Sequence, residues 1–362
     1  MTADAVGGVW QYCVDLIAGL SRRDISVTVA TMGPRPHSQQ RQALLSIPGT
    51  TLIESDWALE WMQSPWMDVG SAGEWLLGLQ QKHGFDLIHL NGFAHAALPW
   101  HKPVVSVAHS CVCSWWRAVH GVAAGPEWAT YKDRVSRGLQ ASVRIIAPSA
   151  SMSKSIESEY AIPSEKVQVI PNFTCIGRSK NPPKEPFLLA AGRFWDKAKN
   201  LALLAQIAPH LPWSVSVVGS TESLDGADAP HSGSVNLLGS LPHDELINQM
   251  RRAAIYIHPA LYEPFGLSVL EAARAGCCLV LSDIPSLREL WEGAAVFVDA
   301  RNPREWVQTI NFLSHDAEAR STLGRLAQKR SGRYRLGSAV NSYCKLYKEL
   351  IDQSHAQSEA AA

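Results

Sequence analysis

Short apolar runs alternate with segments of helical periodicity along almost the whole chain. In the second half, the runs PFLLAA, SVSVV and CCLVL are bounded by turn residues, as is typical of buried strands. Amphipathic segments such as HDELINQMRRA lie between them. The first half repeats this alternation from GGVWQYCVDLIAGL to KVQVIPN. The pattern predicts the α/β class, with parallel sheets covered by helices on both faces.

A Pro- and Lys-rich stretch at 177–186 interrupts the alternation and is the best linker candidate. With 362 residues, the chain is long enough for two domains. We therefore predict two doubly wound, Rossmann-like domains at 1–176 and 187–335. A helix is expected over 336–354, and the polar, Ala-rich tail at 355–362 is expected to be disordered.

The start of the chain is unusual for this fold class. A doubly wound domain begins with a buried strand that leads into its first glycine loop. Here Gly7 and Gly8 follow only MTADAV. Either the first strand is very short, or the recorded start lies downstream of the real one and the first strand is truncated.

The charges and cysteines narrow the class of protein. The 33 basic and 33 acidic residues balance, which argues against a general affinity for nucleic acid. Seven cysteines without metal-ligand spacing suit free thiols in a reducing cytosol. No apolar run reaches the roughly 20 residues that cross a bilayer. We expect a cytoplasmic protein, soluble or peripheral to the inner face of the membrane.

The segment 258–281 carries polar residues where packing alone has no use for them. Glu263 and Glu271 bracket a Pro-Phe-Gly turn, and a helix is expected over 266–275 with Gly276 as its stop. The free amides at such a helix start attract anions, and Glu271 could accept hydrogen bonds from a diol such as a ribose. Alternatively, Ser268 and Glu271 have the spacing of a capping box.

Several motifs occur together in a fixed order. They are Gly7-Gly8, PVVSVAHS, VIPN, AAGRFWDKAKN, VVGS, LLGSLPHDEL and the E-x7-E segment EPFGLSVLE. On these motifs the chain resembles the retaining GT-B glycosyltransferases of family 4. The resemblance implies two Rossmann-like domains that face an interdomain cleft, and a last helix that packs back on the first domain. The alternative for that helix is confinement to the second domain.

The resemblance also implies which residues bind and react. Arg193 and Lys199 would hold the diphosphate of a nucleotide sugar, chemistry that suits a guanidinium and an ammonium. Lys197 is an alternative to Lys199, although Asn200 after Lys199 fits the family pattern better. The implied catalytic residues are His109, Arg193, Lys199 and Glu263. The implied donor contacts are Gly8, Asn172, Gly219, Leu241, Phe265, Gly266, Leu267 and Glu271. For His109 and Asn172, purely structural roles in a strand end and a turn are the alternatives.

The implied chemistry is transfer of a hexose, with retention of anomeric configuration, from a nucleoside diphosphate sugar. UDP is favoured over GDP as the nucleotide. The two cations and the helix start would stabilise the departing diphosphate. The chain contains no Asp-x-Asp pair, so we expect neither a metal nor another cofactor.

The acceptor is expected to be a carbohydrate, a lipid-linked sugar or a small molecule. Trp115, Trp116 and Arg117 follow His109 and could form its binding wall, since such side chains stack on sugars or pair with acids. The window 117–144 contains five Arg or Lys residues and two acids. This excess of positive charge could touch an anionic membrane. An ordinary solvated helix is the alternative.

Two other functions compete with glycosyl transfer. One is a GT-B epimerase that acts on the same kind of donor. The other is a catalytically silent scaffold that binds nucleotide sugars. The presence of Arg193, Lys199, Glu263 and Glu271 together favours an enzyme.

Overall fold

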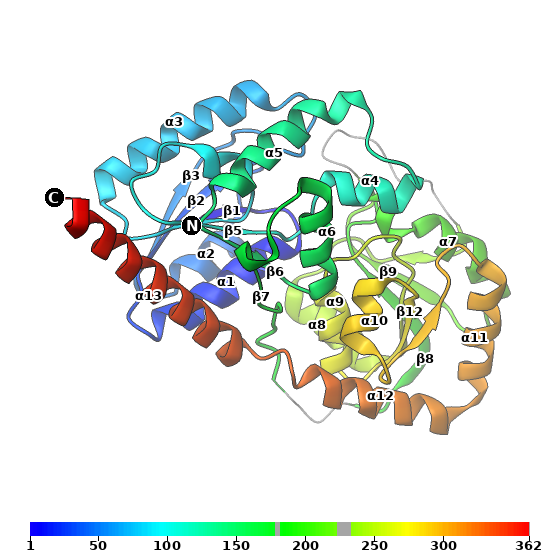
Figure 1. The fold of residues 1–362 in the computed structure, drawn as a ribbon. Helices are drawn as coiled ribbons and strands as arrows, with labels where there is room; N and C mark the ends of the chain where they lie inside the picture. The colour runs from blue at the N-terminus through cyan, green and yellow to red at the C-terminus, as the bar shows by residue number, and fades with distance from the viewer. Residues whose placement is uncertain (178–181, 223–232, 362) are drawn as a thin grey trace. The chain divides into compact units, whose positions relative to one another are not determined.

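The computed structural model describes residues 1–177, 182–222 and 233–361, and Figure 1 shows its elements. The chain forms two compact units. Unit 1 comprises Met1–Arg117, Val122–Phe173 and Arg335–Ala362. Unit 2 comprises Ala118–Gly121 and Thr174–Tyr334. The chain therefore returns to unit 1 after it has completed unit 2.

Unit 1 contains two parallel sheets rather than the single sheet that the sequence pattern suggests. The first has the order β1-β2-β3, and the second has the order β4-β5-β6-β7. Their strands are β1 (Thr2–Asp4), β2 (Val27–Met32), β3 (Thr50–Glu54), β4 (Ile88–Leu90), β5 (Val104–Val107), β6 (Arg144–Ala147) and β7 (Val167–Val169).

The division between the sheets follows from the length of β1. This strand has three residues and pairs with β2 from Thr2 opposite Ala30 to Asp4 opposite Met32. On the side of β1 that faces β4, hydrogen bonds to side chains take the place of backbone pairing. The Asn91 backbone N–H donates to Thr2 Oγ1, and the Asn91 side-chain amide donates to the Thr2 carbonyl oxygen. The strand that precedes the first glycine loop thus has three residues.

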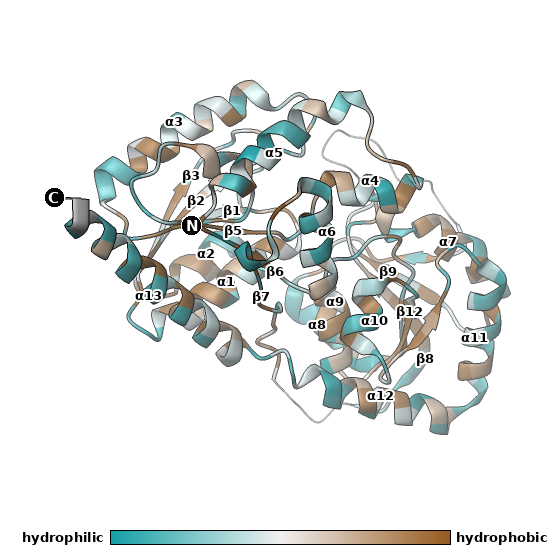
Figure 2. Ribbon diagram, in the orientation of Figure 1, coloured by the Kyte–Doolittle hydropathy of each residue, from teal (hydrophilic) through white to brown (hydrophobic). Residues whose placement is uncertain are grey.

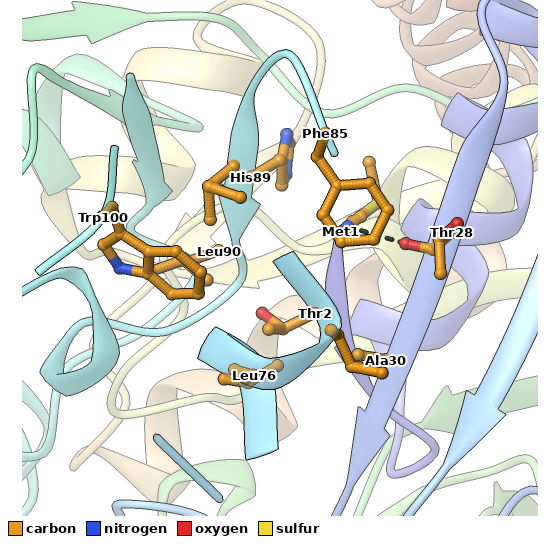
Figure 3. Close-up of a pocket in the computed structure, with 11 residues that line it drawn as sticks. Met1, Thr2, Thr28, Ala30, Leu76, Phe85, His89, Leu90 and Trp100 are labelled. Atoms are coloured by element: carbon orange, nitrogen blue, oxygen red, sulfur yellow. Dashed lines mark hydrogen bonds between the residues drawn. The ribbon is translucent and has the colours of Figure 1, made fainter. Parts of the chain in front are cut away.

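An apolar pocket lies beside this short strand (Figure 3). Leu76, Phe85 and Trp100 are among its lining residues. The amino group of Met1 borders it and donates a 2.8 Å hydrogen bond to the Thr28 carbonyl oxygen. The pocket thus marks the place where the two sheets of unit 1 are not joined by backbone pairing.

The helices of unit 1 cover these sheets. They are α1 (Gly8–Ser21), α2 (Ser38–Leu45), α3 (Trp66–His83), α4 (Val112–His120), α5 (Ala129–Ala141), α6 (Ala150–Tyr160) and α13 (Leu336–Ala361), with 3₁₀ turns η1 (Ala94–Ala97), η2 (Pro126–Trp128) and η3 (Ser164–Lys166). The end of α4, from Ala118 on, belongs to unit 2. The sequence pattern did not predict α2, because Leu44 is its single buried residue and no apolar stripe marks it.

Helix α13 ends the chain within unit 1. It packs on α1 so closely that a Cβ on Gly19 would lie 2.3 Å from Val340 Cγ2. The tail expected to be disordered over 355–362 is helical as far as Ala361, and Ala362 lies outside the described residues. A polar segment rich in alanine can extend a helix that packing has already nucleated.

Unit 2 is built on a six-stranded parallel sheet of order β10-β9-β8-β11-β12-β13. The strands are β8 (Glu185–Ala191), β9 (Val215–Val218), β10 (Asn236–Leu237), β11 (Ala253–His258), β12 (Cys278–Ser282) and β13 (Val296–Val298). The predicted linker 177–186 is therefore too long at its end, since Glu185 and Pro186 belong to β8. Residues 178–181 of that linker lie outside the described residues.

The helices of unit 2 are α7 (Leu201–Ile207), α8 (His243–Arg252), α9 (Leu267–Arg274), α10 (Pro285–Trp291), α11 (Pro303–His315) and α12 (Ala317–Ser331), with 3₁₀ turns η4 (Lys197–Lys199) and η5 (Ala208–His210). Across the described residues, no helix is both long and apolar enough to cross a membrane.

The strand residues of unit 2 point alternately to two apolar layers. Tyr256 and Leu279 pack in one layer with Val269 of α9, whereas Ile255 and Val280 pack in the other with Trp306 and its neighbours of α11. Figure 2 shows the corresponding hydrophobic colouring of β8 and β12. Because side chains alternate between the faces of a strand, both faces of this sheet are buried. Since both faces are mostly apolar, the polar side chains of this sheet lie mainly at the ends of its strands.

Candidate active site

The turn between β11 and α9 depends on glycine. Gly266 precedes α9 with φ 84° and ψ 72°, a conformation that other residues rarely adopt. No side chain caps the helix, and Glu271 lies well inside it. The capping-box interpretation of Ser268 and Glu271 is therefore wrong. The amides at the start of α9, an eight-residue helix, are not satisfied by a side-chain cap.

The carboxylate of Glu263, in this turn, is hydrogen-bonded to two side chains. Lys199 Nζ lies 2.7 Å from Glu263 Oε2, and His258 Nε2 lies 3.0 Å from the same oxygen. The hydroxyl of Ser286 donates to the Glu263 backbone carbonyl. Two side-chain donors thus hold one carboxylate oxygen of Glu263, and the serine holds the backbone of the same residue.

The electrostatics keep Glu263 ionised although it is buried. Burial by itself would raise the pKa of Glu263, but the Lys199 ammonium and the His258 hydrogen bond outweigh it and hold that pKa well below its usual range. Burial lowers the pKa of His258, against the opposing effect of Glu263. The site therefore combines a carboxylate, an ammonium and a neutral imidazole.

The loop after β8 carries the predicted phosphate-binding cations. Lys199 lies with its aliphatic stem close to Gly192 and its ammonium on Glu263, whereas Lys197 is exposed. The Arg193 guanidinium lies 5.3 Å from the centre of the Trp195 ring. Since β8 and β11 are neighbours in the sheet, their following loops bring Lys199 and Glu263 together. Lys199, rather than Lys197, belongs to this cluster.

Asn200 fastens the β8 loop to the β11 loop. Its backbone has φ 57°, and its amide donates to the carbonyl oxygens of Pro259 and Ala300 at 3.0 and 3.1 Å. The Leu261 N–H also donates to the Ala198 carbonyl at 2.8 Å. These bonds explain locally why Asn follows Lys199, and they limit the movement of the lysine backbone.

Glu271 has a partner that sequence reasoning missed. His243 Nε2, at the start of α8, lies 2.9 Å from Glu271 Oε1. The Glu271 side chain is 8% exposed, and the His243 side chain is 39% exposed. The histidine therefore holds one carboxylate oxygen of Glu271 from the solvent side.

The remaining predicted donor contacts of unit 2 lie in the loops that follow its strands and at the start of α9. A Cβ on Gly219 would lie 1.8 Å from the Gly192 carbonyl oxygen, so only glycine allows the loops after β8 and β9 to approach this closely. Leu241 is partly buried against the apolar layer that contains Phe265. Leu267 is the first residue of α9.

The predicted sites of unit 1 centre on His109. Its Nε2 lies 2.8 Å from Asn91 Oδ1, and the Tyr12 ring packs edge-on at 4.6 Å. Burial lowers the pKa of His109 to about 3, so the ring is neutral at pH 7. Gly8 begins α1 and is exposed, whereas Asn172 is buried after β7.

The predicted acceptor residues have protein partners of their own. Arg117 and Lys132 both bind the carboxylate of Glu159 at 2.9 Å. The Trp116 ring lies 6.2 Å from Trp115 and a similar distance from Trp128. The sequence window 117–144 omitted Glu159, so its apparent basic excess is partly compensated in the structure. Trp115, Trp116 and Arg117 stay predictions as acceptor contacts.

Sequence reasoning missed three polar partners: His258, His243 and Asn91. A topological signal could have identified two of them. His258 ends β11 just before Glu263, and Asn91 follows β4, the neighbour of β5 and His109. Polar residues at the carboxyl ends of adjacent parallel strands meet at one sheet edge. His243 had no such signal, because its partner lies 28 residues away.

Two family models match consecutive parts of the chain. The model described as Glycosyltransferase Family 4 matches residues 6–177, and the model described as Glycosyl transferases group 1 matches residues 175–330. Together they span residues 6–330, which leaves out β1 and the last helix. The D-inositol 3-phosphate glycosyltransferase of Paenarthrobacter aurescens is 25% identical over 283 residues, which are 69% of each chain.

Solved structures show the same fold at low sequence identity. The sucrose-phosphate synthase of Thermosynechococcus elongatus is 18% identical, with a TM-score of 0.77 over 97% of this chain and 96% of its own. The Anabaena protein HepE, solved in complex with UDP and glucose, is 16% identical, with a TM-score of 0.72 over 97% and 100% of the chains.

Fold and family matches together define the protein as a transferase with the GT-B fold, built from two Rossmann-like units. The chain belongs to the family 4, or group 1, glycosyltransferases.

Proposed function

We propose that this glycosyltransferase moves a hexose from a nucleoside diphosphate sugar, most favourably a UDP-sugar, with retention of configuration and without a metal. The observation that carries the proposal is the cluster of Lys199, Glu263 and His258 beside the start of α9. The titles of the HepE structures name UDP, glucose and UDP-glucose as its ligands, which supports the choice of donor.

The charges of unit 2 suit a departing diphosphate. Arg193 and Lys199 supply positive charge, and the amides of Gly266 and Leu267 point from a helix start. The Lys199 ammonium is bound to Glu263, so the diphosphate would share or take over this cation. Charge that is already in place stabilises the leaving group at little reorganisation cost.

The carboxylates would bind the sugar and the ribose. Glu263, ionised and fixed by two donors, would accept hydrogen bonds from the sugar near the reacting carbon. Glu271 has one oxygen bound to His243 and would use the other for a ribose hydroxyl. Attack from the face of the departing diphosphate would let this group accept the acceptor's proton, so no carboxylate nucleophile is needed.

The acceptor is proposed as a carbohydrate, a lipid-linked sugar or a small polar molecule. The relative from Paenarthrobacter aurescens is named for a phosphorylated inositol. The tryptophans of α4 and the Arg117–Glu159 pair would bind such an acceptor only if Arg117 exchanges its partner. An anionic acceptor can drive this exchange.

The function is tested by release of nucleoside diphosphate from a panel of sugar donors, with and without acceptors and EDTA. One donor should be consumed in the presence of an acceptor, and EDTA should have no effect. Loss of activity in EDTA contradicts the proposed mechanism. Release of UDP with an epimerised sugar identifies an epimerase, and donor binding without turnover identifies a scaffold.

Two substitutions test the roles of the charged residues. Glu263→Ala should lower kcat about 100-fold or more with a smaller change in donor KM, because one charged contact in the transition state contributes several kcal/mol. Arg193→Ala should lower kcat and raise the donor KM. Arg304→Ala, at an exposed position of α11, is the matched control and should leave both unchanged. Full activity of Arg193→Ala would contradict its phosphate-binding role.

A further inference from the structure

Asn91 joins the start of the chain to two histidines of unit 1, His89 and His109. Its amide nitrogen donates to the Thr2 carbonyl at 2.7 Å and to Cys13 Sγ at 3.2 Å. Its amide oxygen lies 2.8 Å from His109 Nε2 and 3.3 Å from His89 Nε2. Every polar atom of the Asn91 side chain is thus used.

The Thr2 carbonyl determines which way the Asn91 amide faces. A backbone carbonyl only accepts hydrogen bonds, so the group 2.7 Å from it must be the NH₂ of Asn91. The reversed amide would place two acceptor oxygens against each other. The Asn91 oxygen is therefore directed at the histidines as an acceptor.

This orientation assigns the proton on each ring. Since Asn91 Oδ1 accepts, His109 and His89 both carry their proton on Nε2. His89 Nδ1 is then an acceptor, and the hydroxyl of Tyr347 lies 2.5 Å away as its donor. The whole network has one consistent set of proton positions, in which His109 Nδ1 is an acceptor as well.

His109 Nδ1 differs from the other acceptors of the network. Over residues 1–177, 182–222 and 233–361, the structure gives it no hydrogen-bond donor. The Tyr12 hydroxyl, on the ring that packs against His109, donates instead to the Tyr343 hydroxyl at 2.6 Å. His109 therefore offers an acceptor that a bound molecule can use.

We propose that Asn91 is a positioning residue that keeps His109 in the neutral Nε2–H tautomer, so that Nδ1 accepts a hydrogen bond from a hydroxyl group of the sugar donor. The ligand side of this inference rests on the proposed function. The tautomer itself does not, because it follows from contacts within unit 1. A histidine held in this way selects ligand groups that donate, and it cannot act as a general acid.

The surroundings of the ring favour the neutral form. Burial lowers the pKa of both His109 and His89 to about 3. Within the described residues, the titratable groups that interact with the two rings or with Asn91 are the Met1 amine, Tyr12, Cys13, Tyr343 and Tyr347; the Asp4 carboxylate lies beyond them and acts on Cys13. None of the interacting groups supplies a negative charge at pH 7, since burial raises the pKa of the thiol and the phenols.

The direct test is nitrogen-15 NMR of the histidine rings in the ligand-free, full-length protein. At pH 7 and at pH 5, His109 should show a protonated Nε2 and an unprotonated Nδ1. A proton on Nδ1, or an imidazolium at either pH, would overturn the proposal. This measurement needs no activity, so it stays informative if the donor proves to be wrong.

The functional test replaces the amide by a carboxylate. In Asn91→Asp, an adjacent negative charge should raise the pKa of His109 by about 1 to 3 units, so that the ring protonates between about pH 4 and 6. In that range Nδ1 becomes a donor, and kcat/KM for the donor should fall about tenfold, the effect of one lost hydrogen bond. The kcat/KM of the variant should recover as the pH rises.

The matched control is Asn341→Asp, on the exposed face of α13, where Asn341 meets Arg23. It should keep the wild-type pH profile. A purely structural Asn91 would lower activity equally at all pH values and leave the titration of His109 unchanged, which would contradict the proposal. If Asn91→Asp does not fold, the wild-type NMR spectrum still decides it.

Discussion

The two glutamates of the E-x7-E segment have different chemical surroundings. Glu263 receives Lys199 and His258 on one oxygen, whereas Glu271 receives His243. Both acids are buried, so their orientation is set before a ligand arrives. Preorganised polar groups bind with less loss of entropy. A histidine that contacts neither phosphate nor sugar can therefore still affect donor binding.

Replacement of His243 tests this at Glu271, the acid proposed to bind the ribose. His243→Ala should raise the donor KM about three- to tenfold with little change in kcat, because Glu271 loses one charge-assisted hydrogen bond. Steady-state kinetics with varied donor would measure both parameters. His243→Gln, which can still donate to Glu271, should recover most of the affinity. An unchanged KM in His243→Ala would show that Glu271 needs no support from α8.

Glu60 gives unit 1 a pH-dependent stability. Burial raises the pKa of Glu60 to about 7, although the backbone N–H groups of Ala94 and Phe93 bind its carboxylate. Since this folded-state pKa exceeds the unfolded value near 4.5, the contribution of Glu60 to stability is complete below pH 4.5. It is lost as the pH rises through 7.

Glu60→Gln should remove this dependence. From pH 5 to pH 8, the free energy of unfolding of the wild type should fall by about 2 to 3 kcal/mol more than that of the variant. Urea unfolding at the two pH values would measure the difference. Glu74→Gln, on the exposed side of α3, is the control and should behave as wild type. Parallel pH profiles for Glu60→Gln and wild type would contradict the assignment.

At the scale of elements, the start of α9 depends on one backbone conformation. Gly266 has φ 84°, and a Cβ there would lie 3.1 Å from Val269 Cγ2 and 3.3 Å from Glu263 Cγ. The same residue thus determines the direction of the helix and leaves room for the Glu263 side chain. Strain at Gly266 would reach the proposed donor contacts directly.

Gly266→Ala should destabilise the protein by about 1 to 2 kcal/mol because of the left-handed backbone, and should weaken donor binding at least tenfold. Thermal unfolding with and without donor would separate the two effects. Gly293→Ala is matched, since Gly293 has φ 74° and a Cβ there would meet nothing within 4 Å. It should lose similar stability and keep donor affinity. Equal affinity losses in both variants would contradict a local role of Gly266.

Elements with strong apolar signals were predictable from the sequence. The helix expected over 266–275 is α9, Leu267–Arg274, because buried Val269 and Leu270 mark its inner face. Helix α2 and the separation of the two sheets of unit 1 were not predictable. They depend on one buried leucine and on the Thr2–Asn91 bonds, which join residues 89 positions apart. The histidine partner of Glu271, His243, likewise required the packed structure, whereas His258 at the end of β11 carried a topological signal.

At the scale of the whole molecule, the chain builds unit 1 from its two ends. In α13 the apolar side chains of Val340, Leu346 and Leu350 are buried. Tyr343 of this helix is hydrogen-bonded to Tyr12, and Tyr347 to His89. Unit 2, by contrast, lies almost entirely in the uninterrupted stretch Thr174–Tyr334. The two units should therefore respond differently to shortening of the chain.

Truncation after Tyr334 should expose amides throughout unit 1, because it removes apolar cover and leaves the buried Tyr12 hydroxyl and His89 Nδ1 without partners. Hydrogen exchange followed by mass spectrometry should show this loss, with unit 2 still protected. Truncation after Leu350 removes mainly exposed residues and should change neither unit. Full protection of unit 1 in the shorter chain would show that α13 is dispensable.

The position of α13 also determines the order in which the two units can be completed during translation. A ribosome delivers the N-terminal residues of unit 1 first, yet the α1 face that Gly19 presents to Val340 stays uncovered until the last residues emerge. Unit 2 can fold as soon as Tyr334 has left the exit tunnel. The unit whose translation begins first is thus completed second, and in the interval its uncovered apolar face is open to aggregation.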